Sequence, residues 1–95
     1  MAIVGVLTLE LRLEHSRSLK DKRQVVQGLK ERLRKKFNVA IAEIGCQDLW
    51  QRTVIAVVTV SGDRRYAERL LQAVEEDAAH VLGADLVEAG VEWLE

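Results

Sequence analysis

A chain of 95 residues with 48% hydrophobic residues, 4% aromatic residues and a formal net charge of -1 has room for one compact soluble domain with a modest core. The lack of proline argues against a disordered or Pro-rich chain, and the single cysteine excludes an internal disulfide framework and favours a reducing cytoplasm. No apolar run approaches the roughly 18 residues of a membrane-spanning helix, so we expect no membrane partner.

The first half of the chain passes from strand to helix periodicity. Residues 7–14 alternate strictly between leucine and polar side chains, which predicts a half-buried strand that starts near Ile3. Ser18 precedes Asp21 by three residues in a capping-box-like arrangement, so a helix is expected to begin there and to run to about Lys36. Its helical spacing predicts that the following side chains are buried: Leu19, Val26, Leu29, Leu33 and Phe37.

The second half of the chain predicts two further strands, a helix and a last strand. Residues 39–45 and the β-branched residues 53–61 form the strands, and the polar residues 46–52 connect them. Asp63 caps a second helix and Gly83 ends it. The apolar face of that helix is expected to carry Tyr66, Leu70, Val74, Ala78 and Val81, and the last strand alternates through Val87, Ala89, Val91 and Trp93.

The order β-α-β-β-α-β predicts a single α+β domain over residues 1–95 with a ferredoxin-like fold. Such a fold has a four-stranded antiparallel sheet with two helices on one face. The connections 14–18, 46–52 and 80–85 should then meet at one end of the sheet, with residues 61–64 at the other end. We expect Val4, Val6, Ile55 and Val57 to point away from the helices, which would invite a homodimer through an exposed sheet face.

The small net charge conceals two oppositely charged halves. Residues 17–36 hold nine Lys/Arg against two acids, whereas residues 75–95 hold seven acids and no Lys/Arg. A chain with a basic helix and an acidic last strand allows two kinds of partner. An anionic partner could bind the helix, or the basic helix of one subunit could contact the acidic strand of another.

The basic side chains of the first helix are regularly spaced. Intervals of three and four residues align Lys20, Arg23, Gln27, Lys30 and Arg34 on one stripe, which can follow a phosphate backbone or can be a solvated helix face. An anion at the helix N-terminus would also offset the unfavourable placement of cations there. The candidate anion- or RNA-binding residues are Arg17, Ser18, Lys20, Lys22, Arg23, Lys30 and Arg34.

The connection between the second and third strands is the other unusual segment. Trp50 could stack on a base or anchor a partner chain, but taken alone it is better interpreted as closing the open end of the core. Its expected closeness to residues 17–20 favours a binding role. The candidate partner or base contacts are Gln47, Asp48, Trp50 and Arg52.

Catalytic and metal-binding patterns are weak in this chain. Cys46 is the only thiol, His15 and His80 are the only histidines, and no pair of these residues has zinc-ligand spacing. The sequence contains no Gly-rich phosphate loop and no nucleophile-elbow motif. We therefore expect a protein that is not an enzyme and that uses no cofactor and no metal.

Two stretches, residues 17–23 (RSLKDKR) and residues 42–52 (AEIGCQDLWQR), resemble the bacterial YlxP-like family, and the resemblance covers essentially the whole chain. It implies a ferredoxin-like fold and no established catalytic residues. Members are often encoded among transcription-termination, initiation-factor and ribosome-maturation genes, which implies a link to translation or ribosome assembly.

These observations lead to three hypotheses. The first is a small non-enzymatic protein associated with RNA or a ribosomal subunit through its basic helix. The second is a self-associating interaction module without nucleic acid, a homodimer through the exposed sheet face or through the hairpin. The third, a small-ligand sensor or an enzyme, would require a pocket near Cys46, His15 and Asp48.

Overall fold

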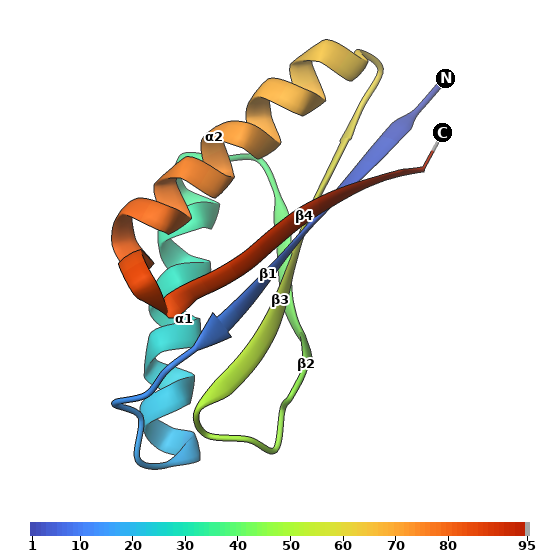
Figure 1. Cartoon of the computed structure of the whole chain (residues 1–95). Helices are drawn as coiled ribbons and strands as arrows, with labels where there is room; N and C mark the ends of the chain where they lie inside the picture. The colour runs from blue at the N-terminus through green and yellow to red at the C-terminus, as the bar shows by residue number, and fades with distance from the viewer. Residues whose placement is uncertain (95) are drawn as a thin grey trace.

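The computed structural model describes residues 1–94 and has the element order β-α-β-β-α-β (Figure 1). All strand pairs are antiparallel, the sheet order is β2-β3-β1-β4, and both helices cover the same face (Figure 1). The structure therefore confirms the ferredoxin-like α+β fold. The elements are β1 (Ile3–Arg12), α1 (Leu19–Lys36), β2 (Ala40–Gly45), β3 (Arg52–Ser61), α2 (Arg64–Leu82), a 3-10 turn (Gly83–Asp85) and β4 (Leu86–Leu94).

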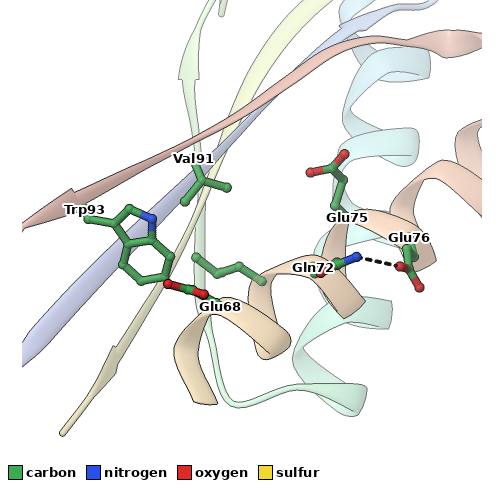
Figure 2. Close-up of a pocket in the computed structure, with 7 residues that line it drawn as sticks. Glu68, Gln72, Glu75, Glu76, Val91 and Trp93 are labelled. Atoms are coloured by element: carbon green, nitrogen blue, oxygen red, sulfur yellow. Dashed lines mark hydrogen bonds between the residues drawn. The ribbon is translucent and has the colours of Figure 1, made fainter. Parts of the chain in front are cut away.

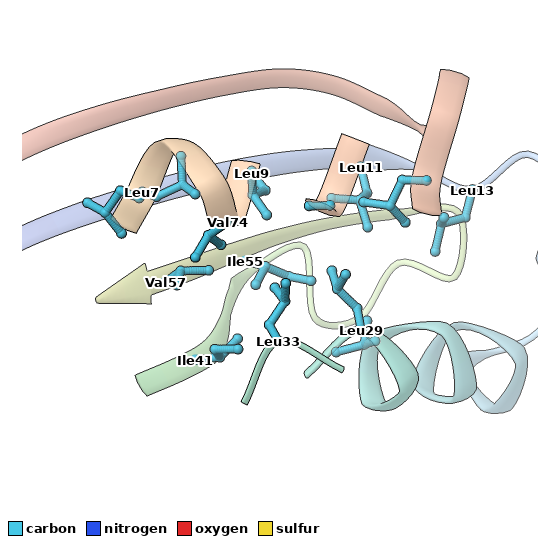
Figure 3. Packing of buried hydrophobic residues seen from close by; sticks show 14 residues of the cluster. Leu7, Leu9, Leu11, Leu13, Leu29, Leu33, Ile41, Ile55, Val57 and Val74 are labelled. Carbon is cyan, nitrogen blue, oxygen red and sulfur yellow. The ribbon is translucent and has the colours of Figure 1, made fainter. Parts of the chain in front are cut away.

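The hydrophobic core lies between the helices and the inner face of the sheet (Figure 3). Leu7, Leu9 and Leu11 of β1 are buried together because alternate residues of a strand point to the same face. Leu19 was expected among the buried residues but is exposed, since Lys22 occupies the sheet-facing side of that first helical turn. The other members of the cluster are Leu13, Val26, Leu29, Leu33, Ile41, Ile55, Val57, Leu71, Val74, Ala78 and Leu82, with Phe37 partly buried against it.

The buried face of α2 differs from the prediction. Tyr66 and Val81 are 52% and 46% exposed, so their expected burial is wrong. The predicted and the observed face share Val74 and Ala78, and contact with the sheet selects residues one position later at both ends of the helix. That face consists of Ala67, Leu71, Val74, Ala78 and Leu82.

The outer face of the sheet also differs from the prediction. Ile55 and Val57 were expected to point away from the helices, yet both are fully buried in the core. The register explains this, because Ile55 lies opposite Leu9 and Val57 lies opposite Leu7, both of which face inward. The strand register therefore places these residues on the outer face: Val4, Val6, Val54, Ala56, Val58 and Val60.

Three connections meet at one end of the sheet, as predicted, and Asp85 of the third lines a hollow with His15 and Ser16 of the first. The backbone N–H of Leu13 donates to the carbonyl of Gln51 over 2.8 Å, and the Gln51 side chain donates to the carbonyls of Glu14 and Ser16. The turn between β3 and α2 lies at the opposite end (Figure 1). Within residues 1–94, none of the helices has the length and apolar character needed to cross a bilayer.

Candidate functional site

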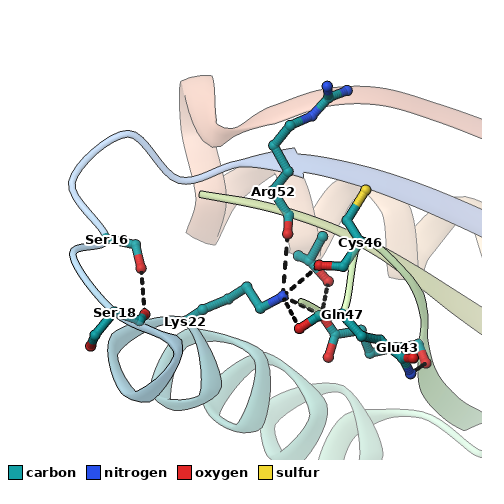
Figure 4. A network of polar contacts seen from close by, with 8 residues as sticks. Ser16, Ser18, Lys22, Glu43, Cys46, Gln47 and Arg52 are labelled. Atoms are coloured by element: carbon teal, nitrogen blue, oxygen red, sulfur yellow. Dashed lines mark hydrogen bonds and ion pairs between the residues drawn. The ribbon is translucent and has the colours of Figure 1, made fainter. Parts of the chain in front are cut away.

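Lys22 is buried between α1 and the hairpin formed by β2 and β3 (Figure 4). Its Nζ donates to the carbonyls of Cys46, Gln47 and Arg52 over 2.8, 3.1 and 3.3 Å. The Oε2 of Glu43 lies 3.0 Å from the same Nζ and also accepts a hydrogen bond from the Thr53 hydroxyl. The buried ammonium of Lys22 therefore supplies hydrogen-bond donors to three carbonyl groups of the hairpin backbone.

The placement of Lys22 corrects its assignment as an anion-binding residue. Its side chain is 1% exposed, so it cannot reach a phosphate in solution. Its spacing from Val26, Leu29 and Leu33 places Lys22 on the buried face of α1, a signal that its assignment to the anion-binding residues overlooked. Its acceptors lie 24 to 30 residues further along the chain and come into reach only through folding.

The N-terminus of α1 is capped by the chain itself. The Ser18 hydroxyl accepts the N–H of Asp21 over 3.0 Å, and the Asp21 carboxylate accepts the backbone N–H of Arg17 over 2.9 Å. A carboxylate already offsets the helix dipole there and would repel an added anion. Ser18 therefore caps the helix, as its spacing from Asp21 predicted, and the Arg17 side chain is exposed. An anion-binding role for Ser18 stays a prediction.

Two cations at the other end of α1 are neutralised by α2. Asp77 accepts hydrogen bonds from Nε of Arg32 over 2.9 Å and from Nζ of Lys36 over 2.7 Å. The bond from Arg32 and then the bond from Lys36 lower the pKa of Asp77 to about 2. These contacts hold the two helices together, and they remove Arg32 and Lys36 from the charge available to a partner.

The remaining cations of the stripe form what we call the basic row: Lys20, Arg23, Lys30 and Arg34. Among residues 1–94, none of the four has an acidic ion-pair partner. Lys20, Arg23 and Lys30 line a shallow groove of about 500 Å³ beside Glu43 of β2. The structure thus brings together four of the predicted residues on one open surface.

The tip of the hairpin presents apolar side chains to solvent. Trp50 is 48% exposed and Leu49 is similarly open, so the interpretation that Trp50 closes the core is wrong. Gln51 is committed to the carbonyls of Glu14 and Ser16, and the Gln47 side chain donates to the carbonyl of Glu43 over 3.2 Å. Asp48 and the Arg52 side chain remain exposed.

Arg12 is a residue of this end that the sequence analysis missed. It lies directly opposite Arg52 in the β1–β3 register, and both arginines line a hollow of about 350 Å³ together with Leu49, Trp50 and one acid, Glu14. Like charges opposite each other weaken a strand pair, so this arrangement suits contact with an anion. The alternation of β1 places Arg12 on the polar face, but only the register shows that Arg52 is its neighbour.

The potential catalytic residues do not form a constellation. His15 lines a hollow of about 390 Å³ with Asp21 and Asp85, while Cys46 and Asp48 lie outside it. Cys46 has a backbone φ of 58°, and its carbonyl binds Lys22. Across the described residues 1–94, no group of three His, Cys, Asp or Glu side chains is close enough to hold a metal ion.

Comparison with known proteins agrees with this assignment of fold and leaves the activity open. A protein of Bacillus subtilis (strain 168) named "Uncharacterized protein YlxP" is 42% identical over 72 residues, covering 76% of this chain and 78% of that protein. The solved structure named "De novo designed protein Foldit4" matches with a TM-score of 0.64 and 14% identity, covering 100% of this chain and 98% of that chain, so it shares the fold alone. The model of the family described as "Protein of unknown function (DUF503)" matches residues 4–90. The chain therefore belongs to the DUF503 family of proteins of unknown function and is similar to YlxP.

Proposed function

We propose that this protein is a non-enzymatic cytoplasmic RNA-binding protein that associates with structured RNA, such as that of a ribosomal subunit, through the basic row of α1. The observation that carries the proposal is the division of the helix cations into committed and uncommitted groups. Lys22, Arg32 and Lys36 are bound within the fold, whereas Lys20, Arg23, Lys30 and Arg34 have no acidic partner among residues 1–94.

The length of the basic row suits a phosphate backbone. From residue 20 to residue 34 the helix rises by roughly 20 Å, at about 1.5 Å per residue, so several phosphates lie within its reach. Each phosphate that a lysine or arginine neutralises releases counterions, which supplies affinity without base recognition. The basic row is therefore suited to track a backbone rather than to read a sequence.

The hairpin tip would contribute a second contact. Trp50 is exposed beside Arg12 and Arg52, and an exposed indole next to guanidinium groups can stack on an unpaired base while the arginines meet phosphate. Gln47 and Asp48 precede Trp50 in the same loop and are exposed. The outer face of the sheet carries valine and alanine along its central strands, so base stacking on sheet aromatics is not the mode that we propose.

The test compares two double charge reversals with the same change in net charge. Arg23→Glu/Arg34→Glu alters the basic row, and Arg65→Glu/Arg69→Glu alters two exposed arginines of α2. Filter binding to ribosomal subunits and to ribosomal RNA fragments, from low to high salt, gives the affinity and its salt dependence. We expect the first variant to bind at least about tenfold more weakly with a shallower salt slope, and the second to bind almost as the wild type does.

Two results would contradict the proposal. The first is the absence of binding at low salt. The second is equal weakening by both variants, because this would show that only the net charge of the protein matters. Circular dichroism and thermal unfolding establish that each variant is folded before its affinity is interpreted.

A second candidate function, self-association without nucleic acid, is favoured by the outer sheet face. Val60 is 64% exposed, and the neighbouring Val4, Val6 and Val58 are only partly covered. Light scattering over a range of protein concentrations should show a dimer that Val60→Glu converts to a monomer, whereas Val81→Glu on α2 leaves it intact. A wild-type monomer at high concentration would exclude this function.

A further inference from the structure

The edge strand β4 and helix α2 enclose a groove on the side of the molecule away from β2 (Figure 2). The groove has a volume of about 400 Å³. Its apolar lining consists of Leu71 of α2 together with Val91 and Trp93 of β4. Val91 is 40% exposed although it lies on the helix-facing side of the sheet. The helices therefore leave part of the inner face of β4 uncovered.

The backbone of β4 is open along the same groove. In the sheet order, β4 pairs with β1 on one side and has no strand on the other. Over its length of nine residues, the outer edge presents N–H and C=O groups that a further strand could pair with. An apolar floor beside an open strand edge is a suitable site for an extended peptide.

Most charges beside β4 are acidic, and the cation on its inner side is Arg64, whose guanidinium lies 4.3 Å from the centroid of the Trp93 ring. Glu88 and Glu92 lie on the outer face of the strand, and Glu88 is directly opposite Glu10 of β1 in the sheet register. On the inner side, Glu75 of α2 borders the groove. Among residues 1–94 none of these carboxylates has an ion-pair partner, and the like-charged pair of Glu10 and Glu88 weakens the sheet unless a cation lies nearby.

These charges argue against a second copy of this chain as the occupant. An antiparallel pairing of two β4 strands about Gly90, the midpoint of β4, would place Glu88 of each copy opposite Glu92 of the other. The cations of this chain are concentrated in α1, which is helical and packed on the sheet, so it cannot supply a basic strand. The complementary partner is a different chain.

We infer that β4 binds an extended basic segment of a partner protein, which adds a fifth strand to the sheet. In this segment apolar residues alternate with lysine or arginine. The apolar side chains pack on Val91 and Trp93, and the cations on the opposite face lie beside Glu88 and Glu92. Main-chain hydrogen bonds supply affinity, and the alternation of side chains supplies specificity.

The test uses a fluorescein-labelled peptide of alternating valine and lysine, about the length of β4. One control peptide has the same composition with valines and lysines in two blocks, and another replaces lysine by glutamate. Fluorescence anisotropy measures the dissociation constant, and Trp93 emission in a Trp50→Phe background reports occupation of the groove. We expect both controls to bind about tenfold or more weakly, because neither presents apolar and basic side chains on opposite faces of a strand.

Matched protein variants localise the binding. Glu88→Lys/Glu92→Lys should abolish it, whereas Glu14→Lys/Glu31→Lys changes the net charge equally at exposed positions elsewhere and should have little effect. Glu88→Lys also removes the like-charged pair with Glu10, so the first variant should unfold at a temperature no lower than the wild type. If it failed to fold, Glu92→Gln alone should still weaken binding.

Three results would overturn the inference. They are no binding of the alternating peptide at millimolar concentration, equal binding of the block peptide, and equal loss in both charge-reversal variants. The first result would show that β4 does not bind such a segment. The other two would show that binding depends on charge alone and not on a strand paired with β4.

Discussion

The Nζ of Lys22 lies 3.0 Å from the Oε2 of Glu43, and this ion pair joins α1 to β2 inside the fold. The three hairpin carbonyls complete the surroundings of the ammonium, which is almost fully buried. Removal of the lysine side chain would take one donor from each of the three carbonyls and the counterion from Glu43, which keeps only the hydrogen bond from Thr53. A buried group that loses its partner is more costly than a pair that is removed as a whole.

Lys22→Met is therefore expected to lower the free energy of unfolding by about 3 kcal/mol. Lys20→Met, at an exposed position two residues earlier in the helix, should change it by less than about 0.5 kcal/mol. Urea denaturation measures both, and the double variant Lys22→Met/Glu43→Leu should recover part of the loss. Equal effects of the two single variants would show that the buried contacts do not stabilise the fold.

Asp77 makes stability depend on pH. Its pKa is lowered to about 2 by hydrogen bonds from Arg32 and then from Lys36, so the folded state favours the charged carboxylate. The stabilisation is complete above pH 4 to 5, where the unfolded group is ionised, and is lost as the pH falls toward 2. Because solvent screens part of the interaction, we expect about 1–2 kcal/mol.

The check is urea denaturation of the wild type and of Asp77→Asn between pH 2 and pH 7. The difference between them should be constant near neutral pH and should shrink toward zero at the acidic end. A difference that does not vary with pH would show that the carboxylate charge is not the source of the stabilisation.

Gly5 allows Leu71 and Trp93 to pack against β1. A Cβ at this position would lie 2.7 Å from Cδ1 of Leu71 and 2.7 Å from Cζ3 of Trp93. We expect Gly5→Ala to lower the free energy of unfolding by about 1–3 kcal/mol and to shift Trp93 emission. Gly90→Ala is the matched control, since nothing lies within 4 Å of its added Cβ, and it should be neutral or slightly stabilising.

Cys46 adopts a left-handed backbone conformation, with φ at 58°, at the start of the hairpin loop. A side chain costs about 1–2 kcal/mol in that region, and a β-branched one is the least tolerated. Cys46→Gly should therefore unfold at a urea concentration close to or above that of the wild type, whereas Cys46→Val should unfold at a lower one. If the valine variant were as stable as the glycine variant, the conformation would not be a constraint on this position.

The fold could be predicted from the sequence because its signals are local. The alternation of leucines in β1, the cap of α1 by Ser18 and Asp21, and the cap of α2 by Asp63 each involve residues a few positions apart. The sequence also shows directly that residues 17–36 are basic and that residues 75–95 are acidic. The helical spacing predicted the alignment of Arg23 and Arg34 on one face of α1, whereas the exposure of Trp50 differs from its interpretation as a residue that closes the core.

Contacts between segments far apart in the sequence decided which side chains are buried and which charges are paired, and the sequence could not predict these contacts. The register of β3 against β1 buried Ile55, and Asp77 of α2 neutralised Arg32 of α1. The helical spacing places Lys22 on the apolar face of α1, but only the fold brings the carbonyls of the β2–β3 hairpin to its ammonium. The sequence by itself determined how much positive charge α1 carries. Only the tertiary structure decided which of those cations remain for a partner, because a charge is available only where the fold supplies no acceptor for it.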